Sequence, residues 1–519
     1  MKKVRRRSLS LLTLLSLFTF FISSGVSADV KLPHVIGANM VLQREVSLPI
    51  WGWADPGETI TVTLGPSKEL TKTGTDGRWK LKLPAMSAGG PFSMTVSGRN
   101  TITLDNILIG EVWICSGQSN MEMGITLINN AEEEIASADY PDIRLFHLAR
   151  KTSERPLDDV NEVWKPCSPG TIVDAPGGWG GFSATAYFFG RELHRELGVP
   201  VGLIDTSWGG TRIEPWTPME GFKSVDSLDD IIEHVRNANK NYKDNLPAKL
   251  VELETWISDT RNALTSGKDL PPNPEWPHHP LNMAHEPMAL YNSMVYPLLP
   301  FAIRGAIWYQ GEANRMDAML YFEKMKALIN GWRAVWDQGE FPFYFTQLAP
   351  FNYRPDNNSH ILPGLWEAQT ASLSIPNTGM AVTVDIGNIE DIHPKNKQEV
   401  GRRLSLWALA KTYGRSGIVY SGPLYRSMSV KGDTIVLRFN YAGSGLSTRD
   451  GKSPDWFEIA GEDMHFVKAD ARIDGDTVVV RNSSIKKPAI VRYAWHNEAE
   501  PNLINKEGLP ASSFRTGTW

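Results

Sequence analysis

The 519-residue sequence has few cysteines, only Cys115 and Cys167. Two cysteines are too few for a disulfide-rich scaffold, or for a zinc or iron–sulfur site built from several cysteines. Positive charge is not in excess either, since 53 Lys and Arg residues stand against 58 Asp and Glu residues. This balance gives no support to nucleic acid or an anionic membrane surface as a partner. The charged fraction of 21% is typical of a folded protein.

Long hydrophobic runs are absent except near the start of the chain. Residues 1–7 are basic, residues 9–23 are apolar, and Val26 and Ala28 are small residues before Asp29. The apolar run is short for a membrane span, so the pattern predicts a secretory signal peptide at 1–28, with an uncleaved anchor as the alternative. Cleavage would leave 48 basic and 58 acidic residues. We therefore expect a secreted or periplasmic protein that has no membrane attachment after cleavage.

The remaining chain divides into three regions by its hydrophobic pattern. Residues 29–107 contain short alternating strands between turn signals, which predicts an N-terminal β-sandwich-like domain. Residues 108–415 alternate strands with helices, which predicts an α/β fold with a parallel sheet covered on both faces. A helical and proline-rich insertion interrupts this region at about 217–285. Residues 416–519 are again rich in strand patterns and form a predicted C-terminal β region.

Polar residues follow four predicted strands of the middle region, where open parallel sheets place their ligands. They are Ser119 in a Gly-Gln-Ser-Asn loop, the pair Gly209-Gly210, the amide-containing run 310–314, and an acid–histidine run at 390–393. A serine, a base, an acid and hydrogen-bond donors for an oxyanion are the components of acyl transfer. Each element alone has an ordinary explanation as a turn, cap or surface residue, so the combination carries the prediction.

Five segments together resemble the sialate O-acetylesterase family of the SGNH hydrolase superfamily. They are GEVWICSGQSNMEM, SWGGTRIEPW, AIWYQGEAN, DIHPKNKQEVGRRL and YAWHNEAEPNLINKEGLPASSFRT. The resemblance covers nearly all of the chain after residue 28. It implies a flavodoxin-like α/β/α hydrolase core with accessory β regions. It also implies removal of acetyl groups from sugar hydroxyls without a metal or other cofactor.

The same resemblance implies the roles of individual residues. Ser119 matches the nucleophile, and His393 matches the base that takes its proton. The oxyanion donors would be the backbone N–H of Ser119 and that of Gly209 or Gly210. Many SGNH enzymes have Gly-x-Asn-Asp in the third block, whereas this chain has Gln310-Gly311-Glu312-Ala313-Asn314. Gln310 is therefore the preferred side-chain donor, with Asn314 as the second choice.

The acid that would orient His393 is less clearly marked. Asp391 belongs to the Asp-Ile-His-Pro pattern and is preferred. Glu390 occupies the position three residues before the histidine, where the superfamily often has an aspartate, and Asp385 ends the predicted strand. A Ser–His dyad assisted by a backbone carbonyl is a further alternative.

Three other features have more than one interpretation. Arg212 would bind a sialic acid carboxylate through its guanidinium, or form a salt bridge to Glu214 or Glu312. Cys115 and Cys167 would form a disulfide, although a buried free Cys115 is preferred. The histidines at 278, 279 and 285 lack the spacing of a metal site, so no metal is predicted.

Eighteen tryptophans are a high number for this length. Aromatic side chains in loops are suited to stacking on sugar rings. Trp51, Trp53, Trp113 and Trp308 lie in predicted strands, however, and are expected in the core.

The sequence therefore predicts a serine carbohydrate O-acetylesterase that acts on an O-acetylated carbohydrate, with O-acetylated sialic acid as the favoured substrate. An acetyl xylan or other hemicellulose esterase on the same scaffold is the alternative enzyme. A non-catalytic carbohydrate-binding protein is the alternative of another class.

Overall fold

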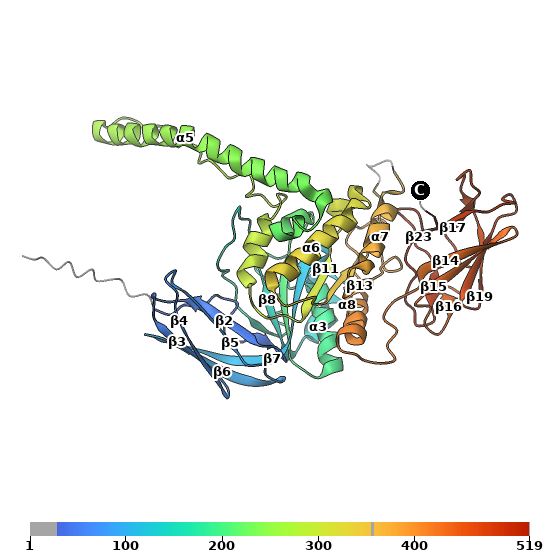
Figure 1. Cartoon of the computed structure of the whole chain (residues 1–519), viewed down its shortest axis with the longest axis horizontal. Helices are drawn as coiled ribbons and strands as arrows, with labels where there is room; N and C mark the ends of the chain where they lie inside the picture. Colours follow the sequence, from blue (N-terminus) through green and yellow to red (C-terminus); the bar gives the residue numbers. More distant parts are fainter. Residues whose placement is uncertain (1–28, 354–357, 518–519) are drawn as a thin grey trace, which may run out of the picture.

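The structure is a computed structural model that describes residues 29–353 and 358–517. The predicted signal peptide at 1–28 lies outside these residues. Figure 1 shows a β-rich N-terminal part, a central α/β part and a β-rich C-terminal part in chain order. Within the described ranges, no helix is both long and apolar enough to cross a membrane.

The central sheet is built around strand β7 (Thr101–Gly117). Its parallel neighbours are β10 (Val201–Ser207) and β11 (Gly305–Tyr309), and beyond β11 lie β12 (Phe343–Thr346) and β13 (Thr378–Ala381). Numbered in chain order, these five strands have the spatial order 2-1-3-4-5 of flavodoxin-like folds. The predicted α/β fold with a parallel sheet is thereby confirmed.

Two further strands extend this sheet past β10. Strand β8 (Tyr140–His147) runs parallel to β10, and β9 (Lys165–Cys167) runs antiparallel to β8. The central sheet is therefore mixed at this edge, while the five strands from β10 to β13 run parallel.

Helices cover both faces of the sheet (Figure 1). They are α3 (Ala184–Leu197) with α8 (Lys397–Trp407), and α6 (Leu320–Trp336) with α7 (Ile361–Ala371). Local sequence defines the ends of α3, because Ser183 accepts a hydrogen bond from the Ala186 N–H at one end and Gly198 adopts a left-handed conformation at the other.

Two strand tryptophans pack under opposite helix layers. In the β7–β11 register Trp113 faces Gly305 and Trp308 faces Ser116, so the two indoles point to opposite sides of the sheet. Trp113 packs against Phe189 of α3 at a centroid distance of 5.0 Å. Trp308 packs against Trp332 of α6 at 6.3 Å. Both indoles are buried, as predicted, so each anchors one layer of the core. Trp51 and Trp53, which were also expected in the core, are only partly buried.

The N-terminal β strands continue directly into the central sheet. Strand β6 (Gly89–Ser97) pairs with β7 over Thr101–Ile109, and β1 (Val41–Gln43) pairs with β7 in parallel. The other strands are β2 (Leu48–Trp53), β3 (Thr59–Leu64), β4 (Ser67–Lys72) and β5 (Arg78–Leu83). The boundary expected at residue 107 therefore falls inside one unbroken strand.

The C-terminal region contains two four-stranded antiparallel sheets and a two-stranded ladder. One sheet holds β14 (Leu424–Lys431), β15 (Thr434–Asn440), β20 (Thr477–Arg481) and β19 (Asp470–Asp474). The other holds β18 (Val467–Lys468), β17 (Phe457–Ala460), β21 (Ile490–Tyr493) and β23 (Phe514–Arg515). The ladder joins β16 (Leu446–Thr448) to β22 (Leu503–Asn505).

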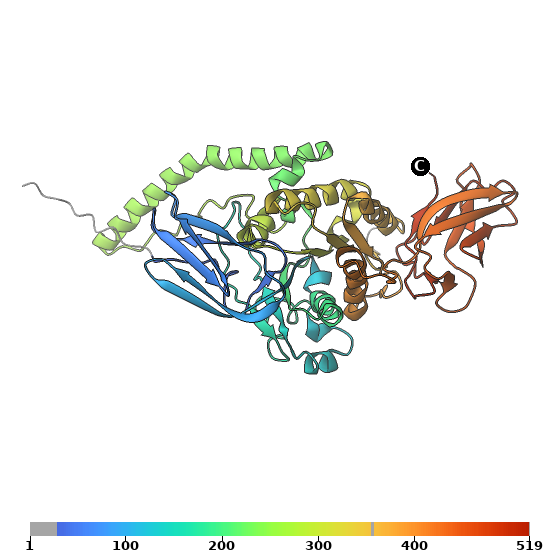
Figure 2. The same cartoon turned by 60° about the horizontal axis from the view of Figure 1, so that its bottom comes forward.

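The insertion at about 217–285 is dominated by one long helix. It begins with the short α4 (Met219–Phe222) and continues into α5 (Asp229–Ser266), of which only Val235 and Ala263 are buried. Figures 1 and 2 show the far end of α5 standing away from the sheet. Among the described residues, the remaining α-helices are the short α1 (Ser119–Glu122) and α2 (Ala131–Ala136).

Candidate active site

Ser119 lies at the topological switch point of the central sheet, where the strand order reverses on either side of β7. Its strand β7 is flanked by β10 and β11, and ligands of this fold bind at the carboxyl ends of such strands. Gly117 ends β7 with a φ of 143°, and a Cβ there would lie 2.2 Å from the Tyr309 carbonyl oxygen. Glycine therefore permits the sharp turn after which Ser119 opens helix α1.

His393 approaches Ser119 from a loop that follows β13. The His393 Nε2 atom lies 2.9 Å from Ser119 Oγ, which is hydrogen-bond distance for a serine and its base. The ring of Trp179 packs edge-on against the imidazole with a centroid distance of 4.8 Å. The two residues assigned as nucleophile and base are thus brought together, although they lie 274 positions apart.

Asp391 is the nearest of the three candidate acids. Its Oδ1 lies 3.9 Å from His393 Nδ1 and accepts the His393 backbone N–H at 2.9 Å. Asp385 instead forms a two-pronged ion pair with Arg403 at 2.6 and 2.7 Å. Glu390 is exposed. Asp391 is therefore positioned to interact with the imidazole, at ion-pair distance and without a direct hydrogen bond to Nδ1.

Gly209 and Gly210 differ in whether their backbone N–H groups are already hydrogen-bonded. The Gly209 N–H donates to Glu122 Oε2 at 2.7 Å. A Cβ on Gly209 would lie 3.2 Å from the Ser119 Cβ, so this close approach favours glycine. In the described part of the chain, the Ser119 and Gly210 N–H groups donate to no other residue, and both residues line the pocket. Ser119 and Gly210 therefore offer the unoccupied backbone donors.

The assignment of Gln310 and Asn314 as oxyanion donors needs correction. Gln310 Nε2 donates to the Thr211 carbonyl and to Asn314 Oδ1, at 3.2 and 2.7 Å. Asn314 Nδ2 donates to Glu214 and to Asp317, at 3.1 and 2.7 Å. Both amides are fully buried and neither residue lines the pocket around Ser119. Their N–H groups hold loops together instead.

Gln118 is the side-chain amide at the pocket, and sequence reasoning missed it. Its Oε1 accepts the backbone N–H groups of Gly311 and Ala313, at 3.3 and 3.2 Å. Because two N–H groups point at this atom, it must be the amide oxygen, and the other atom of the amide is the NH₂ donor. It donates to no described residue, and Gln118 lines the pocket. The sequence signal that could have identified Gln118 is its position directly before Ser119.

Arg212 does not line the pocket either, so its assignment to substrate binding also needs correction. Its Nη2 pairs with Glu214 at 2.9 Å and with Asp317 at 3.0 Å, which is the salt-bridge alternative. Lys324 joins this cluster through a 2.7 Å contact with Glu214. Although burial opposes it, the charges and hydrogen bonds of Lys324 and Arg212 lower the pKa of Glu214 to about 2.

The pocket around Ser119 has a volume of about 500 Å³, and Arg150 is the arginine that lines it. Glu122 Oε1 accepts hydrogen bonds from Arg150 Nε, at 2.6 Å, and from Nη2. The Arg150 side chain is 37% exposed, while Glu122 is buried. Arg150 lies in an irregular loop outside the recognised motifs, so no pattern in a single sequence marks it.

A buried polar cluster lies next to Ser119 and His393. Asn120 accepts a hydrogen bond from Lys397 Nζ at 2.6 Å, and its Nδ2 donates to Glu312 and to the Ile392 carbonyl. Burial lowers the pKa of Lys397 to about 7 and raises the pKa of Glu312. Because Ile392 precedes His393, this cluster ties the histidine loop to the serine loop.

The pKa of His393 predicts the pH dependence of catalysis. Burial and the nearby Lys397 charge hold it below the usual value of about 6.5, while Asp391 opposes them. Only the neutral imidazole accepts the Ser119 proton, so kcat/KM should rise with pH through an apparent pKa below 6.5. Lys397→Met removes a positive charge and should move this inflection upwards. Measurement on a chromogenic acetyl ester tests this, and an inflection unchanged in a folded Lys397→Met protein contradicts it.

The two cysteines form no disulfide, and the described acidic and histidine residues form no metal site. Cys115 and Cys167 are both buried and free, which confirms the prediction of a buried free Cys115 over the alternative of a disulfide. In the ranges that the structure describes, no group of three His, Cys, Asp or Glu side chains is arranged to hold a metal ion.

The chain matches known proteins across the regions that build this pocket. A family model described as carbohydrate esterase, sialic acid-specific acetylesterase, matches residues 109–250 and 279–409. The sialate O-acetylesterase of Mus musculus is 30% identical over 91% of both chains. The Homo sapiens protein is 30% identical over 78% of this chain and 75% of its own.

A solved structure agrees with these matches. A carbohydrate acetylesterase from Xanthomonas citri superposes with a TM-score of 0.79 and 34% identity, covering 95% of this chain and all of that one. The protein is therefore a carboxylic-ester hydrolase, and it belongs to the carbohydrate esterase family of sialic acid-specific acetylesterases.

Proposed function

We propose that this carbohydrate acetylesterase is an exported serine esterase whose favoured substrate is O-acetylated sialic acid. The contact between Ser119 and His393 supports the serine mechanism, and Arg150 in the same pocket supports the acidic sugar. A non-catalytic sugar-binding protein would have no need for a nucleophile and base at hydrogen-bond distance. Export rests on residues 1–28 of the sequence.

In the first half-reaction Ser119 Oγ attacks the acetyl carbonyl while His393 Nε2 takes the serine proton. The oxyanion of the tetrahedral intermediate accepts hydrogen bonds from the Ser119 and Gly210 N–H groups and from the Gln118 amide. The intermediate then expels the sugar oxygen, which receives the proton from His393. An acetyl group remains on Ser119.

In the second half-reaction water replaces the sugar hydroxyl. His393 takes a proton from the water, the resulting hydroxide attacks the acetyl-serine carbonyl, and the same donors stabilise the second oxyanion. Collapse returns the proton to Ser119 Oγ and releases acetate. Asp391 stabilises the imidazolium that forms in both halves, as the acid of a serine triad does.

The charge of Arg150 favours sialic acid over a neutral sugar. Glu122 binds Arg150 through Nε and Nη2, so the guanidinium is held in place with Nη1 available to a ligand. Sialic acid carries a carboxylate next to its sugar ring, whereas the xylose units of acetylated xylan are uncharged. A carboxylate bound to Arg150 would orient the acetylated ring toward Ser119.

Replacing Arg150 by glutamine tests this substrate assignment. Loss of a charge-assisted hydrogen bond should raise KM for O-acetylated sialic acid by about 10- to 100-fold. KM for p-nitrophenyl acetate, which has no carboxylate, should not change. Arg155→Gln removes an exposed arginine five residues away and is the matched control.

The outcome is read from acetate release on three substrates: O-acetylated sialic acid, acetylated xylan and p-nitrophenyl acetate. A wild type that prefers acetylated xylan, with Arg150→Gln unchanged on it, would favour the hemicellulose esterase. A wild type inactive on all three would contradict an active esterase.

A further inference from the structure

A second pocket lies outside the active site, where the C-terminal region meets α7. Its volume is about 420 Å³, within the range of small-molecule sites. Aromatic and polar side chains line it together, namely His360, Asp455, Trp456, Glu458, Trp495 and His496. None of these residues belongs to the catalytic machinery.

Trp456 presents a partly exposed indole to this pocket. The residue is 38% exposed, and its backbone φ of 57° lies in the left-handed region, which is costly for a bulky residue. Reciprocal hydrogen bonds between Asp455 and Asn502 brace the adjoining backbone, at 2.9 and 3.1 Å. In the described ranges the indole N–H of Trp456 donates to no residue. The structure thus holds a rigid aromatic face and a donor toward solvent.

The polar groups around Trp456 complement a sugar ring. His496 packs 5.9 Å from the Trp456 ring and 6.5 Å from His360. Asp455 uses only Oδ1 in its contact with Asn502, so Oδ2 remains an acceptor. Glu458 is paired with Arg492 on the neighbouring strand. An aromatic face for ring C–H groups beside acceptors and donors for hydroxyls is the chemistry that recognises a saccharide.

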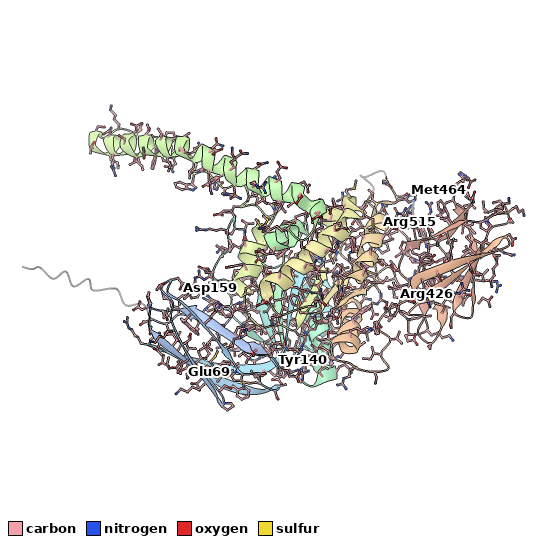
Figure 3. The ribbon with its side chains drawn as sticks, viewed as in Figure 1. Glu69, Tyr140, Asp159, Arg426, Met464 and Arg515 are labelled. Carbon is pink, nitrogen blue, oxygen red and sulfur yellow. The ribbon has the colours of Figure 1, made fainter. Side chains whose placement is uncertain are left out.

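The pocket is fixed firmly to the catalytic domain. Asn497 Oδ1 accepts the Leu362 N–H at the start of α7, at 2.9 Å. Arg515 binds Glu367 of α7 at 2.8 and 3.0 Å and lies 5.2 Å over the Trp495 ring. Figure 3 labels Arg515 at this junction. Both walls of the pocket therefore keep their positions relative to the active site.

One loop connects this pocket to the catalytic histidine. Phe351 donates its N–H to the Asn497 carbonyl, next to His496, and Asn352 donates to the Ile389 carbonyl, both at 3.0 Å. Ile389 lies four residues before His393. At about 3.5 Å per residue this path places the two sites within about 30 Å of each other.

We propose that this pocket binds a sugar ring of the same glycan chain whose acetyl group is cleaved at Ser119. The proposal rests on the proposed function, because its ligand is an oligosaccharide that carries the acetylated sugar. Stacking on Trp456 would hold a long substrate at a second point and raise its local concentration at the active site. Single sugars and small esters reach only one of the two sites and gain nothing.

The test compares Trp456→Ala with wild type on long and short substrates. We use an O-acetylated sialyl oligosaccharide, an acetylated xylo-oligosaccharide and p-nitrophenyl acetate. Trp456→Ala should raise KM about 10-fold for whichever oligosaccharide the wild type cleaves, since loss of aromatic packing has effects of this order. Its kcat, and both constants for p-nitrophenyl acetate, should stay unchanged.

Two further variants separate stacking from general loss of structure. Trp456→Phe keeps an aromatic face and should retain most of the wild-type KM. Trp276→Ala removes the indole of a residue that is 61% exposed on the insertion, and should have no effect. An oligosaccharide KM that is unchanged by Trp456→Ala, or raised equally by Trp276→Ala, overturns the proposal.

Calorimetric titration separates this proposal from the enzyme function. In the Ser119→Ala protein, which cannot turn over, both oligosaccharides are titrated with and without Trp456→Ala. Tight binding that weakens on loss of Trp456 supports the pocket even if the wild type fails on every ester. Absence of binding, or binding indifferent to Trp456, rejects the pocket even if the enzyme is active.

Discussion

Replacing Ser119 by alanine should reduce kcat for acetyl ester hydrolysis by about 10⁴-fold or more. Without Oγ no acetyl-enzyme forms, and His393 has no hydroxyl to deprotonate at 2.9 Å. The donors of Ser119, Gly210 and Gln118 remain, so a small residual rate over water is expected. Acetate release under substrate saturation measures the effect directly.

Covalent labelling provides the control for this result. A serine-directed phosphonate reagent should modify wild type at Ser119 and leave the alanine protein unmodified, as mass spectrometry would show. Matching circular dichroism spectra would establish that both proteins are folded. An alanine protein within tenfold of wild-type kcat would mean that another residue is the nucleophile.

Replacing Asp391 by asparagine should have the second largest effect, a fall in kcat of about 10²- to 10⁴-fold. Asparagine keeps an oxygen that can accept the His393 backbone N–H, so the substitution removes the charge and spares the loop geometry. The imidazolium formed during catalysis then loses its counter-charge, which lies 3.9 Å from Nδ1. Steady-state kcat on p-nitrophenyl acetate is the measurement.

The pH profile supplies a separate readout for Asp391. Because its carboxylate raises the pKa of His393, Asp391→Asn should move the acidic inflection of kcat/KM to lower pH. Glu390→Gln, a charge removal one residue away, should leave both kcat and the inflection near wild type. Equal small effects of the two substitutions would instead support a Ser–His dyad.

The positions of Ser119 and His393 were predictable because the fold constrains them. Parallel strands end at one edge of a sheet, and motifs that follow strands are brought together there whatever their separation in sequence. Trp113 and Trp308 were also predictable as core residues, since buried central strands carry large apolar side chains. These inferences depend only on local pattern and sheet geometry.

The side-chain amide that lines the pocket was not predictable in the same way. Gln310 and Gln118 are both amides at strand ends, and what separates them is the partners that each one meets. Tyr321, which comes from helix α6, donates to Gln310 Oε1 at 2.7 Å, and the Thr211 carbonyl takes the Gln310 NH₂. Such competition for hydrogen bonds arises only from tertiary packing.

Arg150 and Trp179 escaped prediction for another reason. Both lie in irregular loops, where neither hydrophobic periodicity nor a turn signal indicates which way a side chain points. Arg212 carried a stronger sequence signal, being next to the glycine pair, yet it is held by Glu214 and Asp317. Proximity to a motif in sequence was therefore a poor guide to the charge of the pocket.

The unbroken strand β7 has a consequence for how this enzyme can be divided. Residues 101–109 of β7 pair with the N-terminal strands, while residues 111–117 pair with the catalytic sheet and lead directly to Ser119. No linker separates the two parts, so a gene fragment starting near residue 108 would encode a severed strand with an unpaired edge. The N-terminal β domain and the hydrolase must therefore be inherited as one unit when relatives recombine. A minimal enzyme designed from this chain must likewise contain both.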